Sequence, residues 1–201
     1  MSEKRILEKF ADSGAVLKGH FKLSSGLQSN TYIQCSKITN NANLSNELCK
    51  ILVDKILEKI TSDKIDLVVS PAMGGVLVGY EISRILGVAN VFCERVNSEF
   101  QFRRGFQIPD GANILIVEDV ITTGKSSLEV LELLSNYYVN IIAEASLIDR
   151  SDNDVDMEKK LSIPIISLLK IEAETFSPNN IPDYLKNVEA INPGSRFITN
   201  S

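Results

Sequence analysis

The sequence predicts an α/β protein with a mostly parallel central sheet flanked by helices. From residue 65 onward, short β-branched runs alternate with helical patterns, as in right-handed strand–helix–strand crossovers. The runs are apolar almost throughout, which is typical of strands covered on both faces. The chain has 201 residues, of which 44% are hydrophobic and 23% charged. We therefore expect a single ordered domain over residues 1–201.

The elements follow in order from the spacing of apolar residues. Helical spacing predicts helices over residues 2–13, 44–60, 76–86 and 126–136, and Gly14 ends the first of them. Compact β-branched runs predict strands over residues 65–70, 89–94, 113–119, 140–150 and 163–171. Tyr32 and Ile33 indicate an earlier short strand. We expect residues 95–110 to form a polar loop, and residues 177–193, with three prolines, a surface loop or cap.

Charge and composition exclude several classes of partner and location. The net charge of −5 disfavours a nucleic-acid partner, so an anionic substrate must be held by local groups. No apolar run approaches the roughly 20 residues that span a bilayer, and the N-terminus does not resemble a signal peptide. We therefore expect a cytoplasmic protein with no membrane partner. The three cysteines form no CxxC pair, so buried or idle thiols are expected.

The strongest functional signal is "ILIVEDVITTGKSS", residues 114–127. It ends in Gly-Lys-Ser like a P-loop, but Asp119 stands where that motif requires its first glycine. Instead, Glu118 and Asp119 end an apolar strand, at the edge where α/β sheets bind ligands. The Thr-Thr-Gly turn before a helix offers N–H groups to a phosphate, and the two acids can accept hydrogen bonds from vicinal hydroxyls. This order favours a ribose 5-phosphate site; the alternative is an ordinary helix cap that follows an exposed acid pair.

Three further features have both a functional and a structural interpretation. Paired glycines, Gly74 and Gly75, follow a strand and would let backbone N–H groups approach an anion, or form a simple tight turn. Arg150 follows another strand and could pair bidentately with a carboxylate, or lie exposed. His20 is the single histidine, and we expect it to pack or hydrogen-bond rather than to act as a catalytic base.

Several segments together resemble a known enzyme family. "VEDVITTGKS" is similar to the phosphoribosyl-diphosphate (PRPP) signature of type I phosphoribosyltransferases. "GHFKLSSGLQSNTYIQ", "VVSPAMGGVLVGYE", "ERVNSEFQFRRGF", "SLIDR" and "INPGSR" resemble, in order, segments of the orotate phosphoribosyltransferase family. The resemblance covers nearly the whole chain. It implies the type I fold, with a small base-binding hood formed by about residues 1–43 and the C-terminal segment.

The resemblance also implies the reaction and its requirements. The family transfers the phosphoribosyl group of PRPP to orotate, giving orotidine 5′-monophosphate and diphosphate in pyrimidine biosynthesis. A Mg²⁺ ion is carried by PRPP, with Asp119 as its candidate protein contact. The expected partners are the two substrates and a second copy of the chain, in a homodimer whose loop residues act across the interface.

Each matching residue is implied to have a role. The residues implied to bind PRPP are Glu118, Asp119, Val120, Ile121, Thr122, Thr123, Gly124, Lys125 and Ser126. Those implied to bind orotate are Thr122, Arg150, Ser25 and Gly26. Those implied for diphosphate and the mobile loop are Gly74, Gly75, Arg95, Arg103 and Arg104. Asp119 and Arg95 are the implied catalytic residues.

The chain departs from the family pattern in places. Many members have lysines where Ser24 and Gly74 stand, although the shorter branch of the family shares both changes. Many also have lysines and a histidine in the loop, where this chain has residues 96–100, so we hypothesise that Arg103 or Arg104 supplies the missing charge. Three other functions remain open: a phosphoribosyltransferase for another base, a PRPP-sensing regulator, or an α/β domain whose motifs are ordinary turns.

Overall fold

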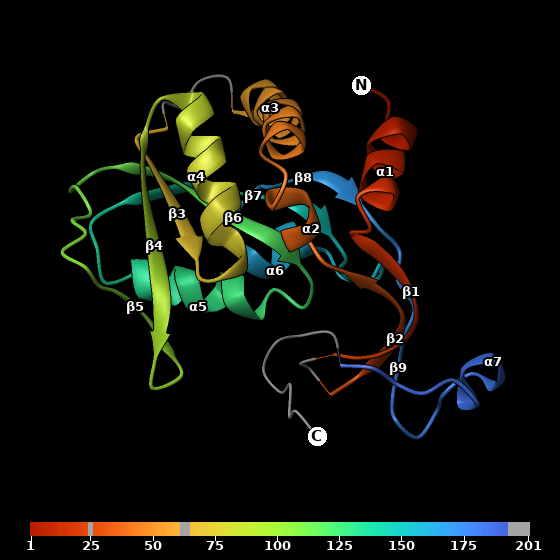
Figure 1. Ribbon diagram of the computed structural model, residues 1–201. Helices are drawn as coiled ribbons and strands as arrows, with labels where there is room; N and C mark the ends of the chain where they lie inside the picture. Colours follow the sequence, from red (N-terminus) through yellow and green to blue (C-terminus); the bar gives the residue numbers. More distant parts are fainter. Residues whose placement is uncertain (24–25, 61–64, 193–201) are drawn as a thin grey trace.

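The central feature of the fold is a twisted sheet in the middle of the molecule (Figure 1). The computed structural model describes residues 1–23, 26–60 and 65–192. Across those residues the sheet has six strands in the spatial order β5-β4-β3-β6-β7-β8. They are β3 (Leu67–Pro71), β4 (Ala89–Val96), β5 (Glu99–Phe102), β6 (Asn113–Ile121), β7 (Asn140–Asp149) and β8 (Ile165–Lys170). Every neighbouring pair is parallel except β4–β5, so the predicted mostly parallel sheet is confirmed.

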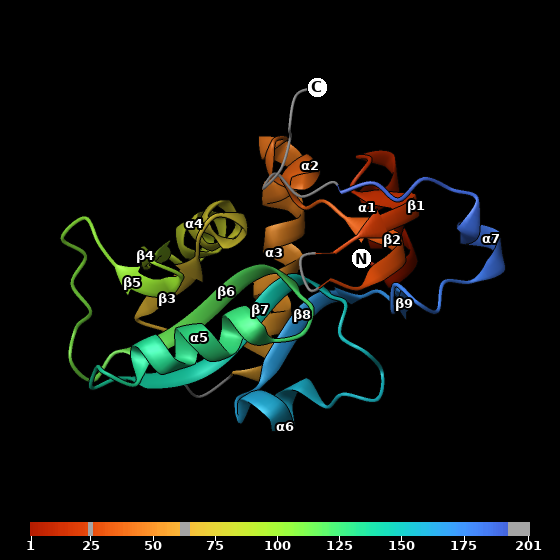
Figure 2. The same cartoon turned by 90° about the horizontal axis from the view of Figure 1, so that it is seen from below.

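Helices cover both faces of this sheet. The helices of the described residues are α1 (Glu3–Asp12), α2 (Ser36–Thr39), α3 (Ala42–Lys59), α4 (Gly74–Leu86), α5 (Lys125–Leu134), α6 (Met157–Leu161) and α7 (Asp183–Lys186), of which α7 lies away from this sheet (Figure 1). Helices α3 and α4 lie on one face, and α5 and α6 on the other (Figures 1 and 2). The four predicted helices are confirmed as α1, α3, α4 and α5.

The sequence of β6 is apolar because both of its faces are covered. Leu115 and Val117 pack in the core cluster that contains α3 and α4. Ile114 and Ile116 pack in the cluster that contains α5. Successive side chains of a strand point to opposite faces, so an interior strand needs an apolar residue at every position. The predicted strands are confirmed on the same grounds, with shifts of a few residues at their ends.

A smaller sheet joins the two ends of the chain beside the main sheet (Figure 1). Its strands are β1 (Val16–Lys22), β2 (Gln28–Ile33) and β9 (Thr175–Phe176), in the order β1-β2-β9. His20 is buried within it: Nδ1 donates a 2.8 Å hydrogen bond to the carbonyl of Val188, and Nε2 contacts the side chain of Gln28. The expected hydrogen-bonding role of His20 is confirmed. This histidine ties the C-terminal segment to β1.

The prediction of a loop over residues 95–110 is wrong in its first part. Strand β4 continues to Val96, and β5 returns antiparallel to it. The two-residue connection, Asn97 and Ser98, has φ of 51° and 74°, the left-handed conformation of tight hairpin turns. Phe100 is buried against the cluster of α5. Four residues of alternating pattern are too few to identify such a strand from the sequence.

No helix in the described ranges is long and apolar enough to cross a membrane.

All three cysteines are free and buried. Burial raises the pKa of Cys49 and of Cys93 to about 12, so both thiols stay protonated and unreactive. The expectation of buried thiols is confirmed.

Candidate active site

The strand order places a topological switch point at the carboxyl ends of β3 and β6. From β3 the chain crosses to β4 on one side, whereas β6 lies on the other side of β3. Open α/β sheets bind ligands at such a switch point. Residues 72–75 follow β3, and Glu118 and Asp119 lie near the end of β6. The fold therefore brings together the paired glycines and the acid pair, which are far apart in the sequence.

The acid pair lies directly against the first turn of α4. A Cβ built on Gly74 would stand 2.4 Å from Oδ1 of Asp119. A Cβ on Gly75 would stand 2.8 Å from the carbonyl oxygen of Val117 and 3.2 Å from Oε1 of Glu118. A side chain at position 75 would clash with backbone, so glycine is needed there, whereas a side chain at position 74 would force the Asp119 carboxylate to move. The glycines make room for the acids as well as for an anion.

Glu118 and Asp119 do not share the same environment. Glu118 is buried, and its Oε1 accepts a 3.0 Å hydrogen bond from the backbone N–H of Asp119. Burial, together with the negative charge of Asp119, holds the pKa of Glu118 well above its usual range. Asp119 is half-buried. Asp119 is therefore the more accessible member of the pair.

The turn after β6 enters α5 with its backbone N–H groups available. Gly124 is the N-cap, with φ of 72° and no side-chain capping bond. The first N–H groups of a helix lack partners within the helix, which makes the position suitable for a phosphate. The turn is held from outside by Lys160, whose Nζ donates a 2.7 Å hydrogen bond to the carbonyl of Thr123. The side chain of Lys125 is 80% exposed, and its Nζ lies 3.9 Å from Oε1 of Glu129 one turn further along α5.

Arg150 lies at the end of β7, beside the smaller sheet. Its guanidinium donates a 3.2 Å hydrogen bond to the carbonyl of Thr31 in β2, and burial lowers its pKa. Tyr32, the next residue of β2, interacts with both charged groups of the site: besides burial, Asp119 raises its pKa and Arg150 lowers it. Tyr32 therefore lies within electrostatic range of both Asp119 and Arg150. The sequence indicated only a strand at Tyr32, since no spacing rule connects it with residues so far along the chain.

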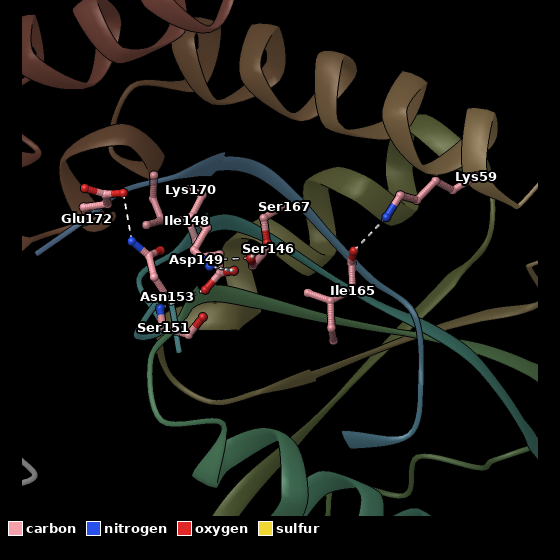
Figure 3. Close-up of polar contacts among 10 residues, drawn as sticks. All are labelled: Lys59, Ser146, Ile148, Asp149, Ser151, Asn153, Ile165, Ser167, Lys170 and Glu172. Carbon is pink, nitrogen blue, oxygen red and sulfur yellow. Dashed lines mark hydrogen bonds and ion pairs between the residues drawn. The ribbon is translucent and has the colours of Figure 1, made fainter. Parts of the chain in front are cut away.

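The turn that carries Arg150 is fixed by local hydrogen bonds (Figure 3). Oδ1 of Asp149 accepts a 2.8 Å hydrogen bond from the N–H of Ser151. Nδ2 of Asn153 donates a 2.8 Å hydrogen bond to Glu172, just beyond β8. These bonds hold the turn to the neighbouring strand and limit the freedom of the Arg150 backbone.

The three arginines of the hairpin are engaged with carboxylates. Arg95 forms an ion pair with Glu129 of α5. Arg103 and Arg104 approach Glu94 of β4, at 4.0 and 3.2 Å. These contacts direct the arginines toward the hairpin and α5. They are not directed at the acid pair in this conformation.

Comparison with known proteins agrees with this geometry. Residues 38–163 match the model of the phosphoribosyl transferase domain family. The chain is 40% identical to an orotate phosphoribosyltransferase of Erythrobacter litoralis, over 98% of this chain and 99% of that protein. It is 41% identical to one of Chlorobium phaeobacteroides, over 100% of both chains. The chain belongs to the orotate phosphoribosyltransferase family.

Comparison with a solved structure supports the fold described above. The crystal structure of orotate phosphoribosyltransferase from Aeropyrum pernix superposes with a TM-score of 0.69 at 20% identity, over 83% of this chain and 93% of that chain. At that identity the likeness concerns the fold alone. The predicted type I phosphoribosyltransferase fold and the predicted family are both confirmed.

The residues that the family resemblance implied are placed as follows. Glu118 to Ser126 form one continuous strand end, turn and helix start, in which Val120 is half-buried and Ile121 is buried. Arg150 directly follows β7, the neighbour of β6, and its backbone N–H donates a 2.8 Å hydrogen bond to the carbonyl of Ile121. Gly26 lies just before β2 with φ of 86°, which favours glycine. Ser25 lies outside the described residues.

Proposed function

We propose that this protein transfers the 5-phosphoribosyl group of PRPP to orotate, giving orotidine 5′-monophosphate and diphosphate, as a step of pyrimidine biosynthesis. The observation that carries the proposal is the grouping of three features at the switch point of the sheet. An acid pair, an uncapped helix N-terminus and a half-buried arginine meet at the carboxyl ends of three adjacent parallel strands. Near-full-length similarity to proteins named for orotate supports the choice of base.

The acid pair and the turn after it would bind the phosphoribosyl group. Carboxylate oxygens of Glu118 and Asp119 accept hydrogen bonds from the ribose 2- and 3-hydroxyls. The turn from Thr122 to Ser126 holds the 5-phosphate through hydroxyls, backbone N–H groups and the positive end of α5. Lys125, the first residue of α5, adds a positive charge beside the phosphate. Support comes from the missing side-chain cap at Gly124, which leaves these N–H groups for a ligand.

Arg150 would bind orotate through its carboxylate. A guanidinium pairs with a carboxylate in a bidentate, directional way, and the partial burial of Arg150 strengthens such a pair. Thr122 would bridge the orotate and phosphate regions, with Ser25 and Gly26 on the hood side. Tyr32 would offer its ring to the space between ribose and base.

Gly74 and Gly75 would bind diphosphate through their backbone, and the hairpin arginines would close over it. Arg95 is the proposed catalytic arginine, with Arg103 and Arg104 as further cations. Arg95 is paired with Glu129, so it must exchange this partner for the leaving diphosphate. Such an exchange suits a loop that excludes water from PRPP while orotate is present.

Mg²⁺ is the proposed metal. Asp119 offers a half-buried hard oxygen ligand of the kind that Mg²⁺ prefers, beside the ribose hydroxyls. Among the described residues, no three His, Cys, Asp or Glu side chains gather to hold a metal, so most ligands would be oxygens of PRPP and water. When bound, the ion offsets the charge of the diphosphate. Asp119 would act as catalytic residue by holding the hydroxyls and stabilising positive charge on the ribose ring.

We further propose a homodimer in the cytoplasm. Met73, Leu77 and Tyr80 follow one side of α4 and are 83%, 55% and 59% exposed. Three large apolar side chains at helical spacing on one exposed face favour a protein contact. Free, buried thiols suit a reducing compartment. Light scattering coupled to size-exclusion chromatography would measure the mass of the assembly.

The test of the function is an assay of orotate consumption by ultraviolet absorbance. Purified protein is mixed with PRPP, orotate and Mg²⁺, and the assay is repeated with EDTA in excess over Mg²⁺. We expect orotate loss that requires both PRPP and Mg²⁺, with one diphosphate released per orotate. Consumption of adenine or uracil instead of orotate would assign another base. PRPP binding in calorimetry with no base consumed would point to a regulator.

A further inference from the structure

One buried acid next to the proposed phosphate site has no role in the function proposed above. Glu144 lies in β7 with 1% of its surface exposed, between Ile116 of β6 and Ile165 of β8. A carboxyl group in such a place is costly unless its oxygens are hydrogen-bonded. Oε1 accepts a 2.8 Å hydrogen bond from the hydroxyl of Ser127, whereas Oε2 has no hydrogen-bond partner in the described part of the chain. Packing alone would favour an apolar residue at position 144.

The hydrogen bond joins the sheet to the first turn of α5. Ser127 is the third residue of that helix and is itself buried. Residues 122–126 of the proposed phosphate turn immediately precede it. Because a hydroxyl bound to a carboxylate has little rotational freedom, the bond restrains the position of this turn relative to β7.

The turn has a second restraint on its outer side. Lys160 of α6 holds the carbonyl of Thr123, and Met157 leaves no room for a side chain at Gly124, where a Cβ would lie 2.8 Å from its Sδ. Glu144 provides the corresponding polar contact from the interior. The first N–H groups of α5 are thus held between the two contacts, and their direction is set before a ligand arrives.

We infer that Glu144 is a positioning residue for the 5-phosphate of PRPP, acting through Ser127 on the N-terminal turn of α5. This inference rests on the proposed function. Pre-set N–H groups lower the cost of ordering the turn when the phosphate binds. Glu144 touches neither substrate, so its loss weakens PRPP binding and leaves the chemistry and the orotate site unchanged.

The ionisation of Glu144 fits this placement. Burial raises the pKa of Glu144 to about 7, against the lowering effect of the Ser127 hydrogen bond. In β6, Glu118 interacts electrostatically with Glu144. A side chain that is largely uncharged below neutral pH can stand close behind a phosphate site without repelling the phosphate.

The test compares Glu144→Leu, Glu144→Gln and Ser127→Ala in PRPP binding measured by calorimetry and in steady-state kinetics. Leucine has a similar shape but accepts no hydrogen bond, whereas glutamine keeps an acceptor oxygen for Ser127. We expect Glu144→Leu and Ser127→Ala each to weaken PRPP binding about tenfold, the worth of one hydrogen bond to a charged or buried acceptor. The KM for orotate and kcat should stay near wild type, and Glu144→Gln should restore PRPP affinity.

The double variant Ser127→Ala/Glu144→Leu separates a shared effect from two local ones. If Glu144 affects PRPP affinity through its hydrogen bond with Ser127, the double variant binds PRPP with the same affinity as the single variant that binds it more weakly. Unchanged PRPP affinity in folded Ser127→Ala overturns the inference, as do additive losses or equal changes in both KM values and kcat. Ser127→Ala keeps the test decisive if Glu144→Leu does not fold. Wild-type protein that binds no PRPP refutes the proposed function itself, which distinguishes that failure from failure of the inference.

Discussion

The carboxylate of Asp119 occupies the space in which a side chain at position 74 would lie, since a Cβ on Gly74 would be 2.4 Å from Oδ1. We predict that Gly74→Ala displaces Asp119 and strongly lowers kcat. Gly74 is the first residue of α4, and alanine is a better helix former than glycine. The variant should therefore lose activity while its melting temperature stays the same or rises.

Val76→Ala, in the same turn of α4, is the matched control. It changes the helix surface without approaching Asp119, and we expect nearly normal kcat. Thermal melting and kcat measured for both variants show whether Gly74→Ala loses activity without losing stability. Full activity in a folded Gly74→Ala protein would show that Asp119 can move without cost.

The structure also explains which features the sequence could and could not predict. The strands and the long helices were predictable because β6 and its neighbours are apolar on both faces and α3 has a clear buried side. The adjacency of Glu118, Asp119 and the turn to Ser126 was predictable because these residues are contiguous. The contacts of Asp119 with Gly74, and of Thr31 with Arg150, depend on how distant strands are arranged, which local spacing does not encode.

Asp119→Asn tests the role of the accessible acid. Asparagine has nearly the same shape but no charge, so it cannot stabilise positive charge on the ribose ring. We expect kcat to fall about 100-fold or more, in the range of other lost electrostatic contacts to a transition state. The circular dichroism spectrum should be unchanged. Turnover near wild type in a folded protein would remove the proposed ribose and metal role.

Arg150→Lys tests recognition of the orotate carboxylate. Lysine keeps the charge but lacks the planar fork that pairs with a carboxylate, and its shorter reach loses the bond to Thr31. We expect the KM for orotate to rise about tenfold or more, since a bidentate charged pair becomes a single contact. PRPP binding should be unaffected. Arg84→Lys, in an exposed pair with Glu81 on α4, is the control and should change neither constant.

Arg103→Ala and Arg104→Ala test whether the hairpin replaces the missing loop lysines. Both side chains are more than half exposed and share Glu94 as partner, so either can turn toward the diphosphate at small cost. We expect at least one substitution to slow the single-turnover rate at saturating substrates. Unchanged rates in both variants would leave Arg95 as the one hairpin cation in the proposed reaction.

The stability of the protein should depend on the ionisation of Glu144. Burial raises the pKa of Glu144 to about 7 from an unperturbed value of 4.5, so the folded protein keeps a proton that the unfolded chain releases between these values. Protonated Glu144 therefore contributes to the free energy of unfolding. This contribution has its largest value, roughly 3 kcal/mol at most, below about pH 4.5, and it is lost as the pH rises to about 7. Glu144→Gln has no such proton to lose.

Urea denaturation of wild type and Glu144→Gln at pH 5.5 and pH 8 isolates this effect. Glu118 also holds its proton on folding and acts in the same direction, but it is present in both proteins and largely cancels in the difference. We expect the variant to gain stability relative to wild type as the pH rises, because only wild type must ionise a buried acid. An equal difference at both pH values would mean that Glu144 titrates alike in the folded and unfolded chains.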